Sequence, residues 1–139
     1  EAVQKRAGTR LRRAGRDLTI VTYGAMVGLA LDGAAELAKE GIEAEVVDLR
    51  TLLPLDEETV LESVKRTSKA LILHEDARTL GIGAEVAATL AEKAYEWLDA
   101  PVVRVTAPDT PVPFAPALEA AFLPSLSTLL SAARRLAAY

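Results

Sequence analysis

The sequence has 139 residues, 50% of them hydrophobic and 26% charged, with no cysteine, one histidine and a net charge of -4. This length and apolar content suit one compact domain and exclude disorder, collagen-like repetition and low-complexity scaffolding. Without cysteine there can be no disulfide, thiolate nucleophile or cysteine metal site, and a single imidazole, His74, excludes the usual zinc ligand sets. A self-contained enzyme would need carboxylates, hydroxyls, lysines or His74, and only oxygen-ligand metals such as magnesium stay open.

Strand-like and helix-like segments alternate along the chain. Four runs of strand length are rich in β-branched residues: 18–23, 44–49, 70–74 and 102–106. The spacing of apolar residues predicts helices over 26–40, 56–66, 83–98 and 125–138. Gly41 can end the first helix, acidic and basic residues flank the second as the helix dipole favours, and Ser125 can cap the fourth.

This alternation predicts an α/β fold, a three-layer sandwich with a mostly parallel sheet of about five strands and helices on both faces. Residues 9–13 and 18–23 flank a turn at 14–17, which predicts a hairpin whose first strand forms an antiparallel edge. Residues 1–16 are then a basic leading arm with the first hairpin strand, and 17–139 are the domain itself. Residues 107–124 hold five prolines and predict a stiff loop.

The charges are unevenly distributed. Residues 1–16 carry six basic side chains against Glu1, whereas residues 17–139 carry 10 basic and 19 acidic ones. The arm has no aromatic residue to stack on a base, so we expect no nucleic-acid partner and favour a solvated arm or a docking surface for an acidic neighbour. No apolar run approaches 18 residues and no signal-peptide pattern is present, so we expect a cytoplasmic protein with no membrane partner.

The chain begins at Glu1 without an initiator methionine, so we expect a fragment or a processed segment.

The carboxyl ends of parallel strands are where ligands of such sheets bind. The chemically densest segment there is 74–85, which opens with His74, Glu75 and Asp76 and contains Gly81 and Gly83. Its side chains would suit acid-base work, and its glycines would let backbone amides approach an anion at a helix start. The ordinary alternatives are a buried structural histidine and a tight turn with close helix packing. Asp48 and Arg50, at another strand end, are explained by a salt bridge.

Four motifs, in this order and spacing, carry a family resemblance. They are DLTIVTYG at 17–24, VVDLRTLLPLDEETV at 46–60, HEDARTLGIGAEVAATLAE at 74–92 and APVVRVTAPDTPVPF at 100–114. Over residues 17–139 the chain resembles the C-terminal domain of the beta subunit of the thiamine-diphosphate-dependent 2-oxo acid dehydrogenase decarboxylating component, in the transketolase C-terminal domain family. Relatives commonly have a glycine pair where this chain has Leu80-Gly81.

The resemblance implies that this chain assembles an enzyme and does not catalyse its reaction. In such enzymes thiamine diphosphate and magnesium lie between the alpha subunit and the N-terminal beta domain, which also supply the catalytic histidines. The chain has no glycine-aspartate-glycine motif with a following asparagine. We therefore expect no catalytic, cofactor or metal residues here. The implied partners are the alpha subunit, the N-terminal beta domain, a second beta subunit across the two-fold axis of a heterotetramer, and the dihydrolipoyl acyltransferase subunit-binding domain.

The resemblance also implies positions for these contacts. Asp99 matches an acidic residue that pairs with the acyltransferase subunit-binding domain in some relatives, and the carboxylate of Tyr139 is a second candidate. Phe114 and Phe122 are large apolar groups in a segment that relatives bury between subunits, so we expect them at a subunit interface.

Two alternatives stay open. One is a stand-alone flavodoxin-like module that holds a nucleotide or phosphate at Gly81-Ile82-Gly83. The other is the corresponding domain of a different thiamine enzyme, such as a transketolase or a deoxyxylulose phosphate synthase. The residues that would distinguish pyruvate, branched-chain 2-oxo acids and acetoin as substrates would lie outside this chain.

Overall fold

A computed structural model describes residues 8–139; Lys5 and Arg6 of the basic arm lie outside this range. The five strands form one sheet in the order β1-β3-β2-β4-β5, with β1 antiparallel to its neighbour and the others parallel. The strands are β1 (Arg10–Arg13), β2 (Leu18–Thr22), β3 (Ala44–Asp48), β4 (Ala70–Ala77) and β5 (Val103–Ala107). The predicted mixed sheet with one antiparallel edge strand is confirmed.

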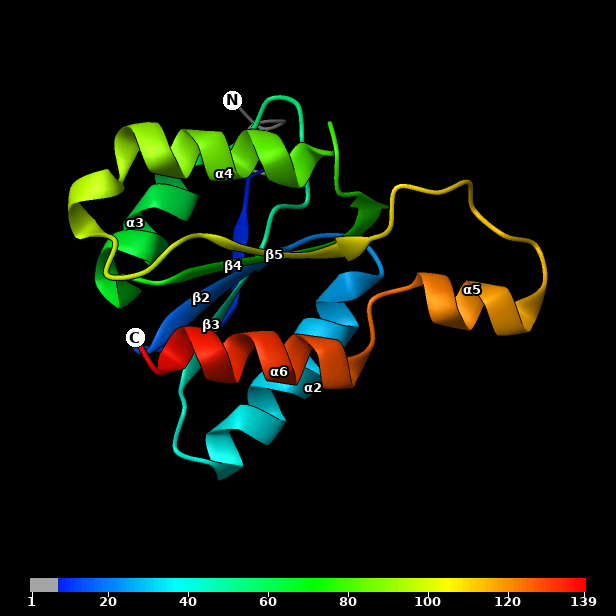
Figure 1. The fold of residues 1–139 in the computed structure, drawn as a ribbon. Helices are drawn as coiled ribbons and strands as arrows, with labels where there is room; N and C mark the ends of the chain where they lie inside the picture. Colours follow the sequence, from blue (N-terminus) through cyan, green and yellow to red (C-terminus); the bar gives the residue numbers. More distant parts are fainter. Residues whose placement is uncertain (1–7) are drawn as a thin grey trace.

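Helices cover both faces of the sheet, as predicted (Figure 1). Helices α2 (Met26–Lys39) and α6 (Leu126–Ala137) share one apolar core with the sheet, while α3 (Glu57–Thr67) and α4 (Ile82–Lys93) share the other. The short helix α5 (Pro116–Phe122) extends away from these layers beyond the end of β5 (Figure 1). Within residues 8–139, no helix combines the length and apolar character needed to cross a membrane.

The predicted hairpin is wrong. Strand β1 pairs with β3, in the register Arg10 to Asp48, and does not pair with the next strand in the chain. Two ion pairs accompany this pairing: the Arg12 guanidinium lies 3.3 Å from the Asp48 carboxylate and the Arg13 guanidinium 2.8 Å from that of Glu43. Arg12 and Arg13 are consecutive in β1, and both of their acidic partners belong to β3 or the residue just before it, so these ion pairs support the pairing of β1 with β3.

The long proline-rich segment is not a loop throughout, because α5 lies within it. Pro116 stands at the start of α5, where the missing amide hydrogen costs nothing. The third predicted helix is also shorter than expected: α4 ends at Lys93, and a 3-10 turn, η1 (Tyr95–Trp97), follows it. Trp97, which the predicted helix over 83–98 would include, lies outside α4, and the Lys65 ammonium lies over its ring, 4.4 Å from the ring centre.

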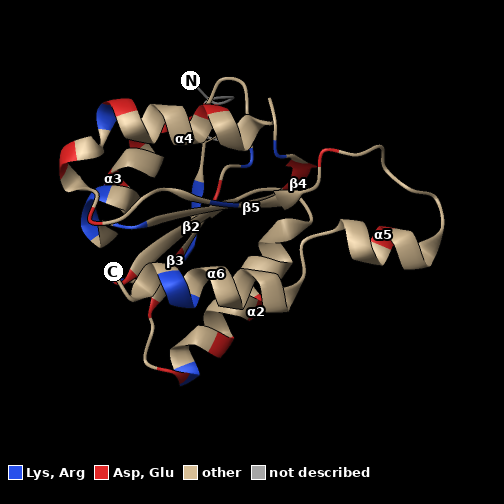
Figure 2. Cartoon of the chain, in the orientation of Figure 1, with Lys and Arg blue, Asp and Glu red and all other residues tan. Residues whose placement is uncertain are grey.

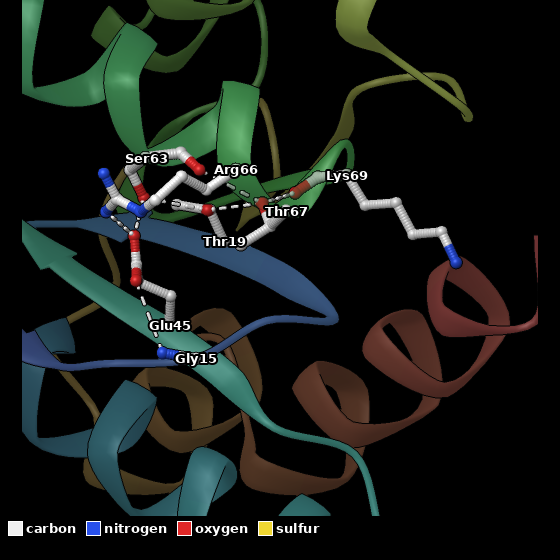
Figure 3. A network of polar contacts seen from close by, with 7 residues as sticks. All are labelled: Gly15, Thr19, Glu45, Ser63, Arg66, Thr67 and Lys69. Carbon is white, nitrogen blue, oxygen red and sulfur yellow. Dashed lines mark hydrogen bonds and ion pairs between the residues drawn. The ribbon is translucent and has the colours of Figure 1, made fainter.

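A buried polar network ties the amino ends of β2 and β3 to α3 (Figure 3). Thr19 on β2 bonds to the hydroxyls of Ser63 and Thr67 at 2.9 and 2.7 Å. Glu45 on β3 is 2% exposed and accepts hydrogen bonds from Ser63 and from the Arg66 guanidinium. All of these buried polar groups have partners, so the network positions α3 on the sheet. The sequence interpretation missed it.

Candidate functional site

The carboxyl end of β4 carries the sequence segment with the most chemistry, and His74 is fully buried there. Its Nδ1 accepts a hydrogen bond from the backbone amide of Asp76 at 3.1 Å, and its ring stacks on that of Tyr23 with 6.0 Å between centres. Glu75 and Asp76 are exposed. Since Nδ1 is the acceptor, the neutral ring carries its proton on Nε2, which has no hydrogen-bond partner in the described structure.

Burial favours the neutral form of both rings. Desolvation lowers the pKa of His74, against the opposing influence of the Asp76 carboxylate. Desolvation, helped by Asp76 and Glu75, raises the pKa of Tyr23 to about 12. Both rings are therefore neutral near pH 7. A neutral, fully buried imidazole packed under a helix is not positioned to exchange protons with a solute.

The Gly81-Ile82-Gly83 turn is closed by its own chain. A β-carbon on Gly83 would lie 2.1 Å from His74 Nε2, and one on Gly81 would lie 2.2 Å from the carbonyl oxygen of Ala77. Neither glycine has a positive φ, so both are needed for close packing of α4 on β4. Leu80, the residue before this turn, has a φ of 62° and a side chain that is 96% exposed.

The predicted salt bridge between Asp48 and Arg50 is not formed. The Asp48 carboxylate pairs with Arg12 instead, and only the backbone amide of Arg50 reaches it, at 3.2 Å. Arg50 has a φ of 54°, which directs its side chain away from the position that a regular strand would give it.

Thr79 and Asp109 join the two loops at this end of the sheet. The Thr79 amide and hydroxyl donate to the two carboxylate oxygens of Asp109 at 2.8 and 2.6 Å. These two hydrogen bonds lower the pKa of Asp109. Arg78 and Arg104 add a reciprocal pair, in which each guanidinium donates to the backbone carbonyl of the other residue, at 3.2 and 2.7 Å.

Asp99 and Tyr139, the two predicted docking residues, lie at the opposite end of the sheet from these loops. The Asp99 amide donates to the Ser68 carbonyl at 2.9 Å. Lys69 follows Ser68 in the chain, and its ammonium group donates to the Ala137 carbonyl at 2.9 Å. Both predicted residues are exposed. The hydrogen bonds of Ser68 and Lys69 connect the segment of Asp99 to the end of α6 near Tyr139, and docking at these two residues stays a prediction.

Asp99 also borders an open groove of about 460 Å³. Its other lining residues are mostly apolar: Ala87, Ala91, Tyr95, Leu98, Ala100, Pro101 and Val102.

Of the two predicted interface phenylalanines, Phe114 is fully exposed and Phe122 is only 9% exposed. Phe122 packs within its own chain at the end of α5 and offers little free surface, while the placement of both residues at a subunit interface stays a prediction. Residues 110–118 contain no charged side chain, and Figure 2 shows that α5 carries little charge compared with α3 and α4. Val112 and Leu118 are also mostly exposed. Phe114 and these two neighbours form an apolar surface, here called the Phe114 surface.

The donor groups of residues 8–139 do not form a site that fits magnesium diphosphate. The sequence has no asparagine, and among residues 8–139 no three His, Asp or Glu side chains lie close enough together to hold a metal ion. No step that uses thiamine diphosphate can be derived from these residues.

Comparison with known proteins relates both the fold and the four sequence motifs to one family. Residues 7–129 match the family model described as transketolase, C-terminal domain. The chain is 50% identical over 123 residues to the beta subunit of the acetoin:2,6-dichlorophenolindophenol oxidoreductase of Cupriavidus necator. It is 48% identical over 125 residues to the beta subunit of the pyruvate dehydrogenase E1 component of Bacillus subtilis. These alignments cover 88% and 90% of the chain but only 36% and 38% of the relatives, so the chain spans little more than a third of their length.

Solved structures agree with this. A split-gene transketolase, described as an inactive beta4 tetramer, superposes with a TM-score of 0.81 at 31% identity, over 95% of this chain and 42% of that one. A transketolase from Pichia stipitis shares the fold, with a TM-score of 0.65 at 19% identity over 98% of this chain and 19% of its own. The resemblance drawn from the four motifs is confirmed, and the chain belongs to the transketolase C-terminal domain family.

Proposed function

We propose that this chain is the assembly and docking domain of the beta subunit of a thiamine-diphosphate-dependent dehydrogenase that decarboxylates a 2-oxo acid or cleaves acetoin. The observation that carries the proposal is the 48 to 50% identity to the C-terminal parts of beta subunits from both classes of enzyme. The identity extends over nearly the whole chain and so includes both ends of the sheet.

The geometry supports assembly in preference to catalysis. His74 is buried under α4, and atoms of the same chain fill the space beside Gly81 and Gly83. In contrast, the Phe114 surface and the groove beside Asp99 are open to solvent. An apolar surface of this kind on a charged protein is typical of a contact with another subunit. The proposed partners of the Phe114 surface are a second beta subunit, the N-terminal beta domain and the alpha subunit, within a heterotetramer in the cytoplasm.

A chimera tests the proposal directly. Residues 8–139 replace the aligned segment of the Bacillus subtilis beta subunit, and the product is expressed with its alpha subunit. We expect co-purification of the two subunits and acyl transfer to lipoamide that depends on thiamine diphosphate and magnesium. A soluble, folded chimera that leaves the alpha subunit unbound would contradict the assigned role. The same exchange with the aligned segment of the Cupriavidus necator beta subunit is the matched control.

The Phe114 surface has its own test in the same chimera. Phe114→Ser removes a large apolar side chain that is fully exposed in this chain. The variant should therefore still fold. We expect weaker association of subunits in sedimentation, because that side chain would be buried on assembly. Leu53→Ser, which changes another exposed apolar side chain, is the control. Equal sedimentation of the wild type and both variants would remove the Phe114 surface from the interface.

A further inference from the structure

A cavity of about 710 Å³ lies where the free edge of β5 meets α6 and the end of α5. It is distinct from the groove beside Asp99 and from the Gly81-Gly83 turn. Three arginines, Arg78, Arg104 and Arg135, contribute to its wall, together with the hydroxyl residues Thr106, Ser127, Thr128 and Ser131. No Asp or Glu lines it. The volume is in the range of small-molecule sites.

The positive charge at this cavity is unusual for the chain, since residues 17–139 carry 19 acidic and only 10 basic side chains. Among residues 8–139, the ion pairs of the structure include none of the three arginines. One acidic residue, Asp109, is close enough to Arg78 for the guanidinium charge to help lower the pKa of Asp109. Both of its carboxylate oxygens, however, are already occupied by Thr79. The arginines therefore retain donors for another anion.

Two of the arginines are held in place by the backbone. The Arg78 guanidinium donates to the Arg104 carbonyl at the free edge of β5, and the Arg104 guanidinium donates to the Arg78 carbonyl. Each guanidinium has five donors, so most of its hydrogen-bonding capacity is still available. An anion that reached both guanidinium groups would offset the repulsion between their like charges. The reciprocal pair thus prepares a site for an anion before one binds.

Helix α6 supplies the third arginine and the hydroxyls. Ser127, Ser131 and Arg135 are spaced by four residues and share one face, which lines the cavity. Arg134 lies on the adjacent face, where it pairs with Glu40 at 2.6 Å. The first turn of α6 also contributes Ser127 and Thr128, so the positive end of its dipole adds to the field of the arginines.

From this arrangement we infer that the cavity between β5, α5 and α6 binds a small molecule through a phosphate or diphosphate group. Guanidinium groups match phosphate oxygens with paired hydrogen bonds, and serine and threonine hydroxyls donate to the remaining oxygens. The volume exceeds that of a phosphate group alone and leaves room for the rest of a phosphorylated metabolite. This site goes beyond the proposed assembly role, and either can fail without the other.

Calorimetric titration of the 139-residue chain with inorganic pyrophosphate at low salt tests the inference. We expect saturable 1:1 binding that weakens roughly tenfold in Arg135→Gln, because one set of charge-assisted hydrogen bonds is lost. Arg134→Gln makes the same change of charge on the same helix but outside the cavity, and should bind within about twofold of the wild type. Thermal unfolding of each variant checks that it is folded.

A second variant keeps the test decisive if Arg135→Gln does not fold. Ser131→Asp places a carboxylate at an exposed position of the cavity wall and should abolish pyrophosphate binding by repulsion. Absence of saturable binding by the wild-type chain, or equal weakening in Arg134→Gln and Arg135→Gln, would overturn the inference. Binding of a glutamate-rich peptide without any binding of pyrophosphate would also overturn it, since the cavity would then serve an acidic protein segment.

Discussion

His74 Nε2 and Gly83 face each other so closely that a β-carbon on the glycine would lie 2.1 Å from the nitrogen. The histidine is fully buried at the end of β4, and the glycine is the second residue of α4. This contact sets how closely the helix approaches the sheet. The motif that begins at His74 and ends in the glycine turn is thus explained by packing, and its histidine is neutral because it is desolvated.

Gly83→Ala should destabilise the chain. The added methyl group overlaps the His74 ring and lies 3.2 Å from the Ile72 side chain, so α4 must shift outward. Forcing extra volume into a packed core typically costs about 1 to 3 kcal/mol of unfolding free energy. Urea unfolding at pH 7 measures the loss.

Gly28→Ala is the matched control, since Gly28 also lies within a helix, α2, but a β-carbon there would meet nothing within 4 Å. Alanine has the higher helix propensity, so this variant should gain up to about 1 kcal/mol. Equal stability of Gly83→Ala and Gly28→Ala would show that His74 does not restrict position 83.

Leu80→Gly should preserve or increase stability although it deletes a large side chain. Leu80 adopts a φ of 62°, which costs a non-glycine residue about 1 kcal/mol, and its side chain is almost fully exposed. Relief of this strain offsets the greater freedom that glycine has in the unfolded chain. Thermal unfolding of Leu80→Gly beside Leu118→Gly provides the comparison, because the exposed Leu118 lies within α5, where glycine should cost about 1 kcal/mol. Similar losses in both variants would contradict the strain at position 80.

Stability above pH 10 should depend on Tyr23. Its pKa is raised to about 12 in the folded chain, mainly by burial, so the unfolded chain loses this proton first as the pH rises from 10. The folded state then holds more protons than the unfolded state, and stability falls with increasing pH across the window from 10 to 12. Tyr23→Phe should remove that part of the fall, as measured by urea unfolding at pH 8, 10 and 11. Tyr95→Phe, at an exposed ring, serves as the control and should follow the wild-type profile. If Tyr23→Phe also followed the wild-type profile, Tyr23 would not be the origin of the loss of stability above pH 10.

The predicted sheet was correct in class and wrong in one pairing, for a physical reason. Periodicity and β-branched residues locate strands, but they carry no information on which strand lies beside which. The pairing of β1 with β3 depends on contacts between distant residues, such as Arg12 with Asp48 and Arg13 with Glu43. The close approach of Gly15 to the backbone of Glu45 belongs to the same pairing. None of these can be recognised as pairs in the sequence.

Helix α5 could have been predicted. Pro116 followed by an alanine-rich run of six residues is a helix start signal, and the abundance of proline in the segment obscured it. The buried network of Thr19, Glu45 and Ser63 has no such local signal, because its members come from three elements. The three cavity arginines also come from separate elements and have no local signal. In the sequence, only the four-residue spacing of Ser127, Ser131 and Arg135 can be recognised.

Asp99 is the residue on which the proposed docking of the acyltransferase subunit-binding domain depends most. It is exposed, it borders an open apolar groove, and hydrogen bonds through Ser68 and Lys69 connect its segment to the carboxyl end of the chain near Tyr139. The excess of acidic over basic side chains in residues 17–139 favours a positively charged partner. Such complementarity acts mainly on the association rate and on the choice of partner.

Asp99→Lys should therefore weaken binding of the isolated subunit-binding domain more than Asp99→Ala does, because reversal adds repulsion to the lost attraction. An exposed ion pair contributes about 0.2 to 1 kcal/mol, and both losses should shrink as salt is raised. The measurement is a titration of the assembled decarboxylating component at low and high salt. Asp32→Lys makes the same change of charge on an exposed position of α2, outside the groove, and should have a smaller effect. Unchanged affinity of Asp99→Lys at low salt, or an equal loss in Asp32→Lys, would remove Asp99 from the docking site.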